Sequence, residues 1–316
     1  MKKYSLLLFA CSLLTVVHIA AQQRAGTLRF SVFDANNGVF RELKTEDIRL
    51  TIAKKPVQPS ELTFVNDMPI SLLILVDGSA SQAEVMPAEK LFAERFISSQ
   101  LNAKTDHVGV ARFTGDLEWM HEMNGDLASA IASVREIKFE PPPNYLGGGI
   151  VAGRPISSDS KMGSTSIFDA VVNALPKFAA RTGKAERRAI LIISDGVNTF
   201  GEKKIKVAVE AALKADVSIY AIGISDPSYN PVDKGTLRKL TEGSGGTFFV
   251  PNRKYTDAES LLARLAIAMR STYELKFGLE PSGALVETSL EISNPSFKSR
   301  DLELIQPKGT FVRSEN

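Results

Sequence analysis

Two aspartates and three hydroxyl residues stand where the sequence changes from apolar to polar, and all five offer oxygen ligands. The apolar run "LLILV" ends at Asp77, and Ser79 and Ser81 follow at every second position. A second run, "AILIIS", ends at Asp195, and a third loop places Thr165 directly before a helical pattern. Carboxylate and hydroxyl oxygens suit Mg²⁺, Mn²⁺ or Ca²⁺ better than zinc or copper. The residue types therefore predict a divalent cation site, provided that the fold brings the three loops together.

Each loop also has a local explanation that needs no metal. Asp, Gly and Ser dominate turns for backbone reasons, so "DGSAS" alone favours a solvated turn. Thr165 could cap the helix that follows, and Asp169 lies in its first turn, where the helix dipole favours a carboxylate. The occurrence of all three loops in one chain, each beside a strand or helix start, is what favours a shared site.

The elements that must position these loops extend over residues 69–271. Short apolar runs rich in Val, Ile and Phe alternate there with helical periods, and such runs are typical of strands buried on both faces. The runs read "ISLLILVD", "HVGVARF", "AILIISD", "VSIYAIGI" and "TFFV". The alternation predicts an α/β fold with a doubly wound, mostly parallel sheet. Ligands of such folds bind at the carboxyl ends of the strands, where Asp77 and Asp195 stand.

The flanking segments, residues 22–68 and 272–316, are β-like, with turn residues between short alternating runs. Because the ends of a domain usually lie close together, we expect the two flanks to form one small β module. Residues 140–163 read as a long loop with few core residues.

The amino-terminal residues 1–21 have the pattern of a secretory signal peptide: two lysines, an apolar stretch and small residues before a cleavage position near Ala21. We therefore expect an exported protein, periplasmic or secreted, with no membrane span after cleavage. Cleavage would remove Cys11, the one cysteine, and with it thiolate catalysis. It would leave 36 basic against 36 acidic residues, a balance that does not favour nucleic acid as a partner.

The motif "Asp-x-Ser-x-Ser" at residues 77–81, a Thr before a helix, and "Ser-Asp-Gly" at residues 194–196 together resemble the metal-ion-dependent adhesion site of von Willebrand factor type A domains. The resemblance covers residues 69–271 and implies a Rossmann-like fold. It implies Mg²⁺, Mn²⁺ or Ca²⁺ coordinated by Ser79, Ser81 and Thr165, with Asp77 and Asp195 acting directly or through water. The flanks are similar to those of bacterial exported type A-related proteins. Ala80 and Gln82 depart from the commonest motif without removing a donor.

The resemblance implies metal-dependent protein binding or adhesion, in which an Asp or Glu of an unidentified partner completes the coordination of the cation. On this interpretation the protein is not an enzyme. Two alternatives stay open: a metal-dependent hydrolase or phosphoryl-transfer enzyme using Asp77 or Asp195, and a structural module of an envelope assembly with an empty site. Enzymatic chemistry would need a general base or a second metal, and the sequence offers no obvious candidate for either.

Overall fold

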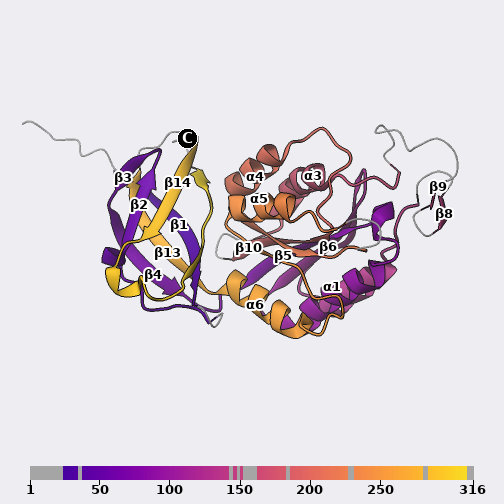
Figure 1. The fold of residues 1–316 in the computed structure, drawn as a ribbon, viewed down its shortest axis with the longest axis horizontal. Helices are drawn as coiled ribbons and strands as arrows, with labels where there is room; N and C mark the ends of the chain where they lie inside the picture. Colours follow the sequence, from indigo (N-terminus) through magenta and orange to yellow (C-terminus); the bar gives the residue numbers. More distant parts are fainter. Residues whose placement is uncertain are drawn as a thin grey trace, which may run out of the picture.

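The computed structural model describes residues 24–34, 38–141, 145–147, 150–151, 162–182, 186–226, 231–279 and 284–311. The signal peptide predicted at residues 1–21 and most of the long loop predicted at residues 140–163 lie outside these ranges. In the described part, an α/β unit lies beside a smaller unit made of strands (Figure 1). The two units are joined by the short connections from β4 (Pro59–Val65) to β5 (Ile70–Asp77) and from α6 (Ala258–Arg270) to β13 (Thr272–Leu279).

The α/β unit is built on a six-stranded sheet, which confirms the predicted fold class. Its strand order is β12-β11-β10-β5-β6-β7, and every neighbouring pair is parallel except β6 and β7. The remaining strands are β6 (His107–Phe113), β7 (Leu117–Asn124), β10 (Arg187–Ser194), β11 (Val217–Gly223) and β12 (Phe248–Phe249). All eight residues of β5 are buried, as expected for a strand in the middle of a sheet covered on both faces.

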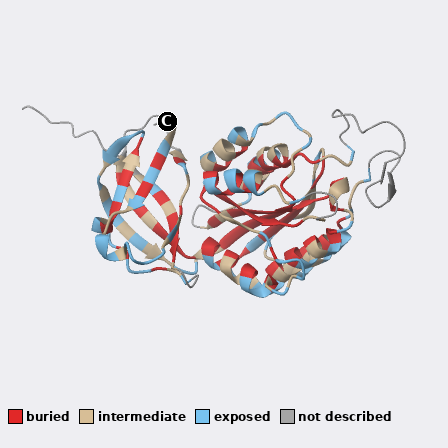
Figure 2. Ribbon diagram, viewed as in Figure 1, coloured by how far each residue is buried: buried red, intermediate tan, exposed pale blue. Residues whose placement is uncertain are grey.

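Helices cover both faces of this sheet, as the burial pattern of Figure 2 shows. One face packs against α1 (Met86–Gln100), α2 (Leu127–Glu136) and α6, and the other against α3 (Ile167–Ala180), α4 (Ile205–Lys214) and α5 (Lys234–Ser244). Alternate residues of β5 enter the two cores: Leu72 and Ile74 face the first group of helices, and Leu73 and Leu75 face the second.

The smaller unit consists of two four-stranded sheets, and each combines strands from both ends of the chain. The first has the order β15-β1-β13-β4, and the second has the order β16-β14-β2-β3. The strands not yet given are β1 (Arg24–Phe33), β2 (Ile48–Ile52), β3 (Lys55–Val57), β14 (Leu285–Ile292), β15 (Glu303–Ile305) and β16 (Gly309–Phe311). Their apolar faces share one core around Phe30, Tyr273 and Phe277. The expected pairing of the two flanks is therefore observed, whereas the exact domain boundaries stay a prediction.

The strand register places the predicted site. Val76 of β5 pairs with Ile193 of β10, so Asp77 and Ser194 end neighbouring parallel strands at the same level. The amino end of β5 lies beside the β unit, and Asp77 stands seven positions after Ile70, about 23 Å along the strand at the usual rise. The candidate site is therefore at the end of the sheet remote from the β unit.

Candidate functional site at the carboxyl ends of two central strands

The loop after β5 folds back on Asp77 and turns two serine hydroxyls to the same side. The Ser79 amide donates to Asp77 Oδ1 at 2.9 Å, which is the local turn that aspartate favours at the end of a strand. A short 3₁₀ helix, η2 (Ala80–Gln82), follows, and the hydroxyl oxygens of Ser79 and Ser81 lie 3.2 Å apart. The spacing of the two serines in the sequence thus becomes a pair of converging oxygens.

The loop after β10 brings the second aspartate to this pair. Ser81 Oγ donates to Asp195 Oδ2 at 3.1 Å, and the Val197 amide donates to Asp195 Oδ1 at 2.9 Å. The turn depends on Gly196, whose φ of +85° favours glycine. A Cβ at Gly196 would also lie 2.8 Å from Leu237 Cγ. The chain therefore turns off the sheet sharply enough to leave Asp195 facing Ser81.

The third loop carries Thr165 and lies against both of the others. The Thr165 amide donates to Thr199 Oγ1 at 2.9 Å, and the Thr165 carbonyl accepts from the Thr199 amide at 2.9 Å. On the other side, the Ala80 amide donates to the Gly163 carbonyl at 3.1 Å. The N-cap of α3 is Ser166, so the capping explanation of Thr165 does not hold. Thr165 is 3% exposed, and its hydroxyl belongs to a loop that connects the two aspartate loops.

The two aspartates are buried carboxylates, and no ion pair with Lys, Arg or His is found for them within the described ranges. Burial raises the pKa of Asp77 to about 7, and the charge of Asp195 adds to the shift, while hydrogen bonds from Ser194 and Ser79 oppose it. Burial also raises the pKa of Asp195. Ionising both groups without a counter-charge is therefore unfavourable, and a divalent cation between them would remove that cost.

The oxygen spacing fits a small divalent cation. Mg²⁺ binds oxygen ligands at 2.0–2.1 Å in an octahedron, so that adjacent ligands lie about 2.9–3.0 Å apart. The two separations, 3.2 Å for Ser79 Oγ to Ser81 Oγ and 3.1 Å for Ser81 Oγ to Asp195 Oδ2, are within about 0.3 Å of that edge. Ca²⁺, which takes six to eight oxygen ligands at 2.3–2.6 Å, is compatible with these separations as well. No cluster of three or more His, Cys, Asp or Glu suited to one metal occurs in the part that the structure describes.

Three polar residues around the site were not selected from the sequence. Ser194 donates its hydroxyl to Asp77 Oδ2 at 2.6 Å and accepts from the Gly196 amide at 3.0 Å. Gln82 donates its amide to Ser81 Oγ at 3.0 Å. Glu89 of α1 is completely buried, and neither of its carboxylate oxygens has a hydrogen-bond partner among the residues that the structure describes. Glu89 could have been found, because it occupies a core position of α1, three residues before Phe92 and seven before Phe96.

Asp169 has a role that the sequence did not indicate. Its carboxylate accepts from the backbone amides of Glu202 at 3.3 Å and Lys203 at 3.1 Å. Gly201 lies against it with φ +103°, and a Cβ there would come within 2.2 Å of Asp169 Oδ2. Asp169 therefore fastens the first turn of α3 to the segment after Asp195, which fixes the Thr165 and Asp195 loops relative to each other.

The two histidines in the described ranges lie away from Asp77. His107 is at the amino end of β6, paired in register with Ser71, and its ring nitrogen is 3.7 Å from Glu186. His121, in the edge strand β7, contacts Asn124 Oδ1 at 3.1 Å. Neither places an imidazole beside Asp77, so these two side chains supply no general base to the site.

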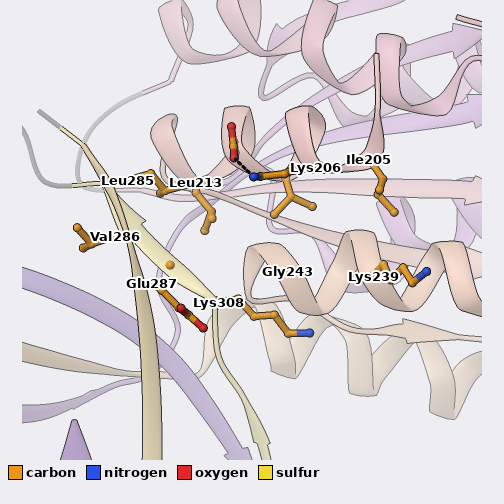
Figure 3. A pocket seen from close by; sticks show the side chains of 12 residues that line it. Ile205, Lys206, Leu213, Lys239, Gly243, Leu285, Val286, Glu287 and Lys308 are labelled. Carbon is orange, nitrogen blue, oxygen red and sulfur yellow. Dashed lines mark ion pairs between the residues drawn. The ribbon is translucent and has the colours of Figure 1, made fainter. Parts of the chain in front are cut away.

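A groove of about 310 Å³ lies elsewhere, between α4, α5 and the strands β14 and β16 (Figure 3). Its walls are mainly apolar, with Ile205, Val209 and Leu213 from α4 and Leu285 from β14. Lys206 on its rim lies 3.8 Å from Glu210. The groove contains none of the five predicted ligands, so it is separate from the site at Asp77 and Asp195.

The model of the von Willebrand factor type A domain matches residues 71–264, well over half of the chain. The chain therefore belongs to the von Willebrand factor type A domain family, as its motif resemblance indicated. Across this family the domain serves in general as a protein-interaction module and is mostly not an enzyme, and it often carries a divalent metal.

Several solved structures match the chain at low sequence identity, with TM-scores below 0.5. The protein BatB from Bacteroides thetaiotaomicron is 19% identical with a TM-score of 0.47, covering 62% of this chain and 97% of its own. A von Willebrand factor type A protein from Catenulispora acidiphila is 11% identical with a TM-score of 0.49, covering 94% and 76%. Proximal thread matrix protein 1 from the mussel byssus, solved with a zinc-occupied adhesion motif, is 15% identical with a TM-score of 0.48, covering 69% and 49%. A search of curated protein sequences finds no match.

No helix in the described ranges is both long enough and apolar enough to cross a lipid bilayer.

Proposed function

We propose that this protein is exported and binds a protein partner through a divalent cation, with Mg²⁺ favoured. The cation would be held by Asp77, Ser79, Ser81, Thr165 and Asp195. A carboxylate of the partner, from Asp or Glu, would complete the coordination, and the surrounding loops would supply specificity. The amino-terminal pattern of residues 1–21 supports export.

The observation that carries the proposal is the continuous row of oxygens from Ser79 through Ser81 to Asp195, with separations of 3.2 and 3.1 Å. The row joins two loops 114 residues apart in the sequence. A solvated turn needs neither this convergence nor the burial of Asp77 and Asp195, and buried carboxylates without a counter-charge are costly. A cation-binding role accounts for both features.

The residues of this site would have different roles in binding the cation. Asp77 and Asp195 would supply two negative charges, which balance a divalent cation, while the three hydroxyls add donors without adding charge. Ser194 and the Ser79 amide hold the two oxygens of Asp77, which fixes the direction of its carboxylate. A bound Mg²⁺ would supply a Lewis-acidic position at which an outside carboxylate can bind.

The test is calorimetric titration of the purified protein, freed of metal, with MgCl₂ and MnCl₂. The wild type should bind one divalent ion per chain, whereas Asp77→Asn, which keeps the shape of the side chain and removes its charge, should bind at least tenfold more weakly. Asp301→Asn is the matched control, because Asp301 is an exposed aspartate of the β unit and its replacement should leave binding unchanged. Equal affinity of Asp77→Asn and the wild type would refute the cation site.

Partner binding is tested with the same proteins coupled to beads. A protein captured from an envelope extract by the wild type and by Asp301→Asn, but not by Asp77→Asn, should elute with EDTA and rebind with Mg²⁺. A partner that is retained in EDTA would contradict docking through the cation.

A further inference from the structure

Glu89 is a buried acidic residue that none of the coordinating roles proposed above uses. Its side chain has no exposed surface, and neither Oε1 nor Oε2 has a hydrogen-bond partner in the described part. A buried carboxylate of this kind is unfavourable unless a positive charge or a proton compensates it. Its position in the core of α1 therefore needs an explanation beyond packing.

The compensating group belongs on the side of the cation site. Burial raises the pKa of Glu89 well above the ordinary value, and the charges of Asp77 and Asp195 add to the shift, so without a cation the protonated carboxyl is favoured. Glu89 and Gln82 lie seven residues apart around the start of α1, with the Glu89 amide bonded to the Val85 carbonyl and the Val85 amide to the Gln82 carbonyl. This places Glu89 behind η2, the loop that carries Ser81.

Gln82 provides a second, independent observation. Its Nε2 donates to Ser81 Oγ at 3.0 Å, so its amide lies at the oxygen cluster. Its Oε1 is buried and, like both oxygens of Glu89, has no donor among the described residues. Three buried oxygens without a donor therefore accompany the two aspartates in the described ranges, and no ion pair to any of these groups is found there.

We propose that Glu89 is a third acidic residue of the cation centre, one that strengthens the binding of a divalent ion from behind Asp77 and Asp195 without coordinating it. This inference rests on the proposed function. The absence of any three-carboxylate cluster that could share one metal within the described ranges indicates that Glu89 acts through space and not as a ligand. Coulomb attraction is weakly screened in a buried region, so a carboxylate that does not touch the ion can still attract it.

The charge balance gives Glu89 a specific consequence. The charge of a bound divalent ion favours the ionised form of Glu89, and the ionised carboxylate in turn attracts the ion. Glu89 would thereby help to retain the ion before any partner carboxylate arrives. The site is accordingly a docking position loaded with its cation in advance, and its loss of metal requires a chelator or a lower pH.

Glu89→Gln is the decisive variant, because it removes the charge and keeps the size of the side chain. Glu84→Gln is its matched control: the same change five residues earlier, at an exposed position. At pH 8 the Kd for Mg²⁺ should rise by about tenfold or more in Glu89→Gln, as expected for a nearby buried charge, and stay within about twofold of the wild type in Glu84→Gln. Unchanged Mg²⁺ affinity in a folded Glu89→Gln protein would overturn the inference.

Thermal melting separates this role from a purely structural one. In EDTA at pH 8, Glu89→Gln should melt at a higher temperature than the wild type, because the folded wild type must either keep a proton on Glu89 or bury its charge near the two aspartates. Addition of saturating Mg²⁺ should raise the melting temperature of Glu89→Gln by less than it raises that of the wild type. If the substitution shifts the melting temperature by the same amount in EDTA and in Mg²⁺, Glu89 has only a packing role and the inference is refuted.

Metal binding by the wild type distinguishes failure of the proposed function from failure of the role of Glu89 alone. If the wild type binds Mg²⁺ and Glu89→Gln binds it equally, only the role of Glu89 fails. If the wild type binds neither Mg²⁺ nor Mn²⁺, the proposed function fails, and the role of Glu89 fails with it.

Discussion

The hydroxyl of Ser194 donates to Asp77 Oδ2 at 2.6 Å and joins the carboxyl ends of two parallel strands that are 117 residues apart in the sequence. The bond is fully buried, and the same hydroxyl oxygen accepts from the Gly196 amide. One serine thus orients the carboxylate of the first loop and begins the turn of the second. This coupling of two loops through one hydroxyl is the basis of the first prediction.

Ser194→Ala should destabilise the metal-free protein and weaken its cation site. Asp77 Oδ2 and the Gly196 amide would each lose a buried partner, and an unsatisfied buried group costs about 1–3 kcal/mol. Urea denaturation in EDTA measures the free energy of unfolding, and calorimetry measures the Mg²⁺ affinity, which should fall severalfold. Ser98→Ala, which removes an exposed hydroxyl on α1, is the control. Equal unfolding free energies of the two variants would contradict the role of Ser194.

Thr165→Val and Thr199→Val should separate coordination from support. Thr165→Val keeps the shape of the side chain but removes the proposed ligand oxygen, so Mg²⁺ affinity should fall about tenfold, equivalent to about 1.4 kcal/mol, with little change in stability without metal. Thr199→Val instead removes the acceptor of the Thr165 amide, a bond of 2.9 Å. It should lower the unfolding free energy by about 1 kcal/mol. If Thr165→Val instead lowers the unfolding free energy and leaves Mg²⁺ affinity unchanged, Thr165 has a structural role and is not a ligand.

The metal-free protein should lose stability relative to Asp77→Asn as the pH rises from about 4 to about 7. The pKa of Asp77 is about 7 in the folded state against an ordinary value of 3.8, so between these values the folded state retains a proton that the unfolded chain has lost. The stabilisation is therefore present below the lower value and lost as the pH rises through the upper one. The difference in unfolding free energy between the wild type and Asp77→Asn should change by up to roughly 1.4 kcal/mol per pH unit and level off above pH 7.

This pH dependence is measured by urea denaturation in EDTA over that range. Saturating Mg²⁺ should reverse the trend, because a bound cation favours the ionised Asp77 and competes with its proton. A constant stability difference between the wild type and Asp77→Asn across the range would contradict the raised pKa.

Gly201→Ala should detach the segment after Asp195 from α3. The φ of +103° at Gly201 disfavours any side chain, and the new Cβ would lie 2.2 Å from Asp169 Oδ2. Loss of the two amide bonds to Asp169 should follow, with a fall of about 2 kcal/mol or more in the free energy of unfolding. Hydrogen exchange at the Glu202 and Lys203 amides reports the detachment directly. Gly125→Ala, where the nearest atom is 3.4 Å from the new Cβ, should leave both readings nearly unchanged.

The sequence by itself determined the fold class and the types of ligand atom. Runs such as "ISLLILVD" are short, almost entirely apolar and rich in Ile, Leu and Val, which is typical of a strand covered on both faces, and their alternation with helical periods predicts the parallel sheet. The oxygen donors Asp77, Ser79 and Ser81 are local to one loop, and their spacing is visible in the chain. The pairing of the two flanks could also be expected, because domain ends lie close together.

The tertiary structure decided which distant groups meet at those donors. The contacts of Ser81 with Asp195 and of Ser194 with Asp77 depend on strand order and register, which local patterns do not encode. The roles of Glu89 and Asp169 depend on how α1 and α3 pack against the loops, because charge and hydrogen bonding act across space irrespective of separation along the chain. The sequence identified the residues that offer oxygen ligands, whereas the packing of the strands and helices determined which charged groups lie near them.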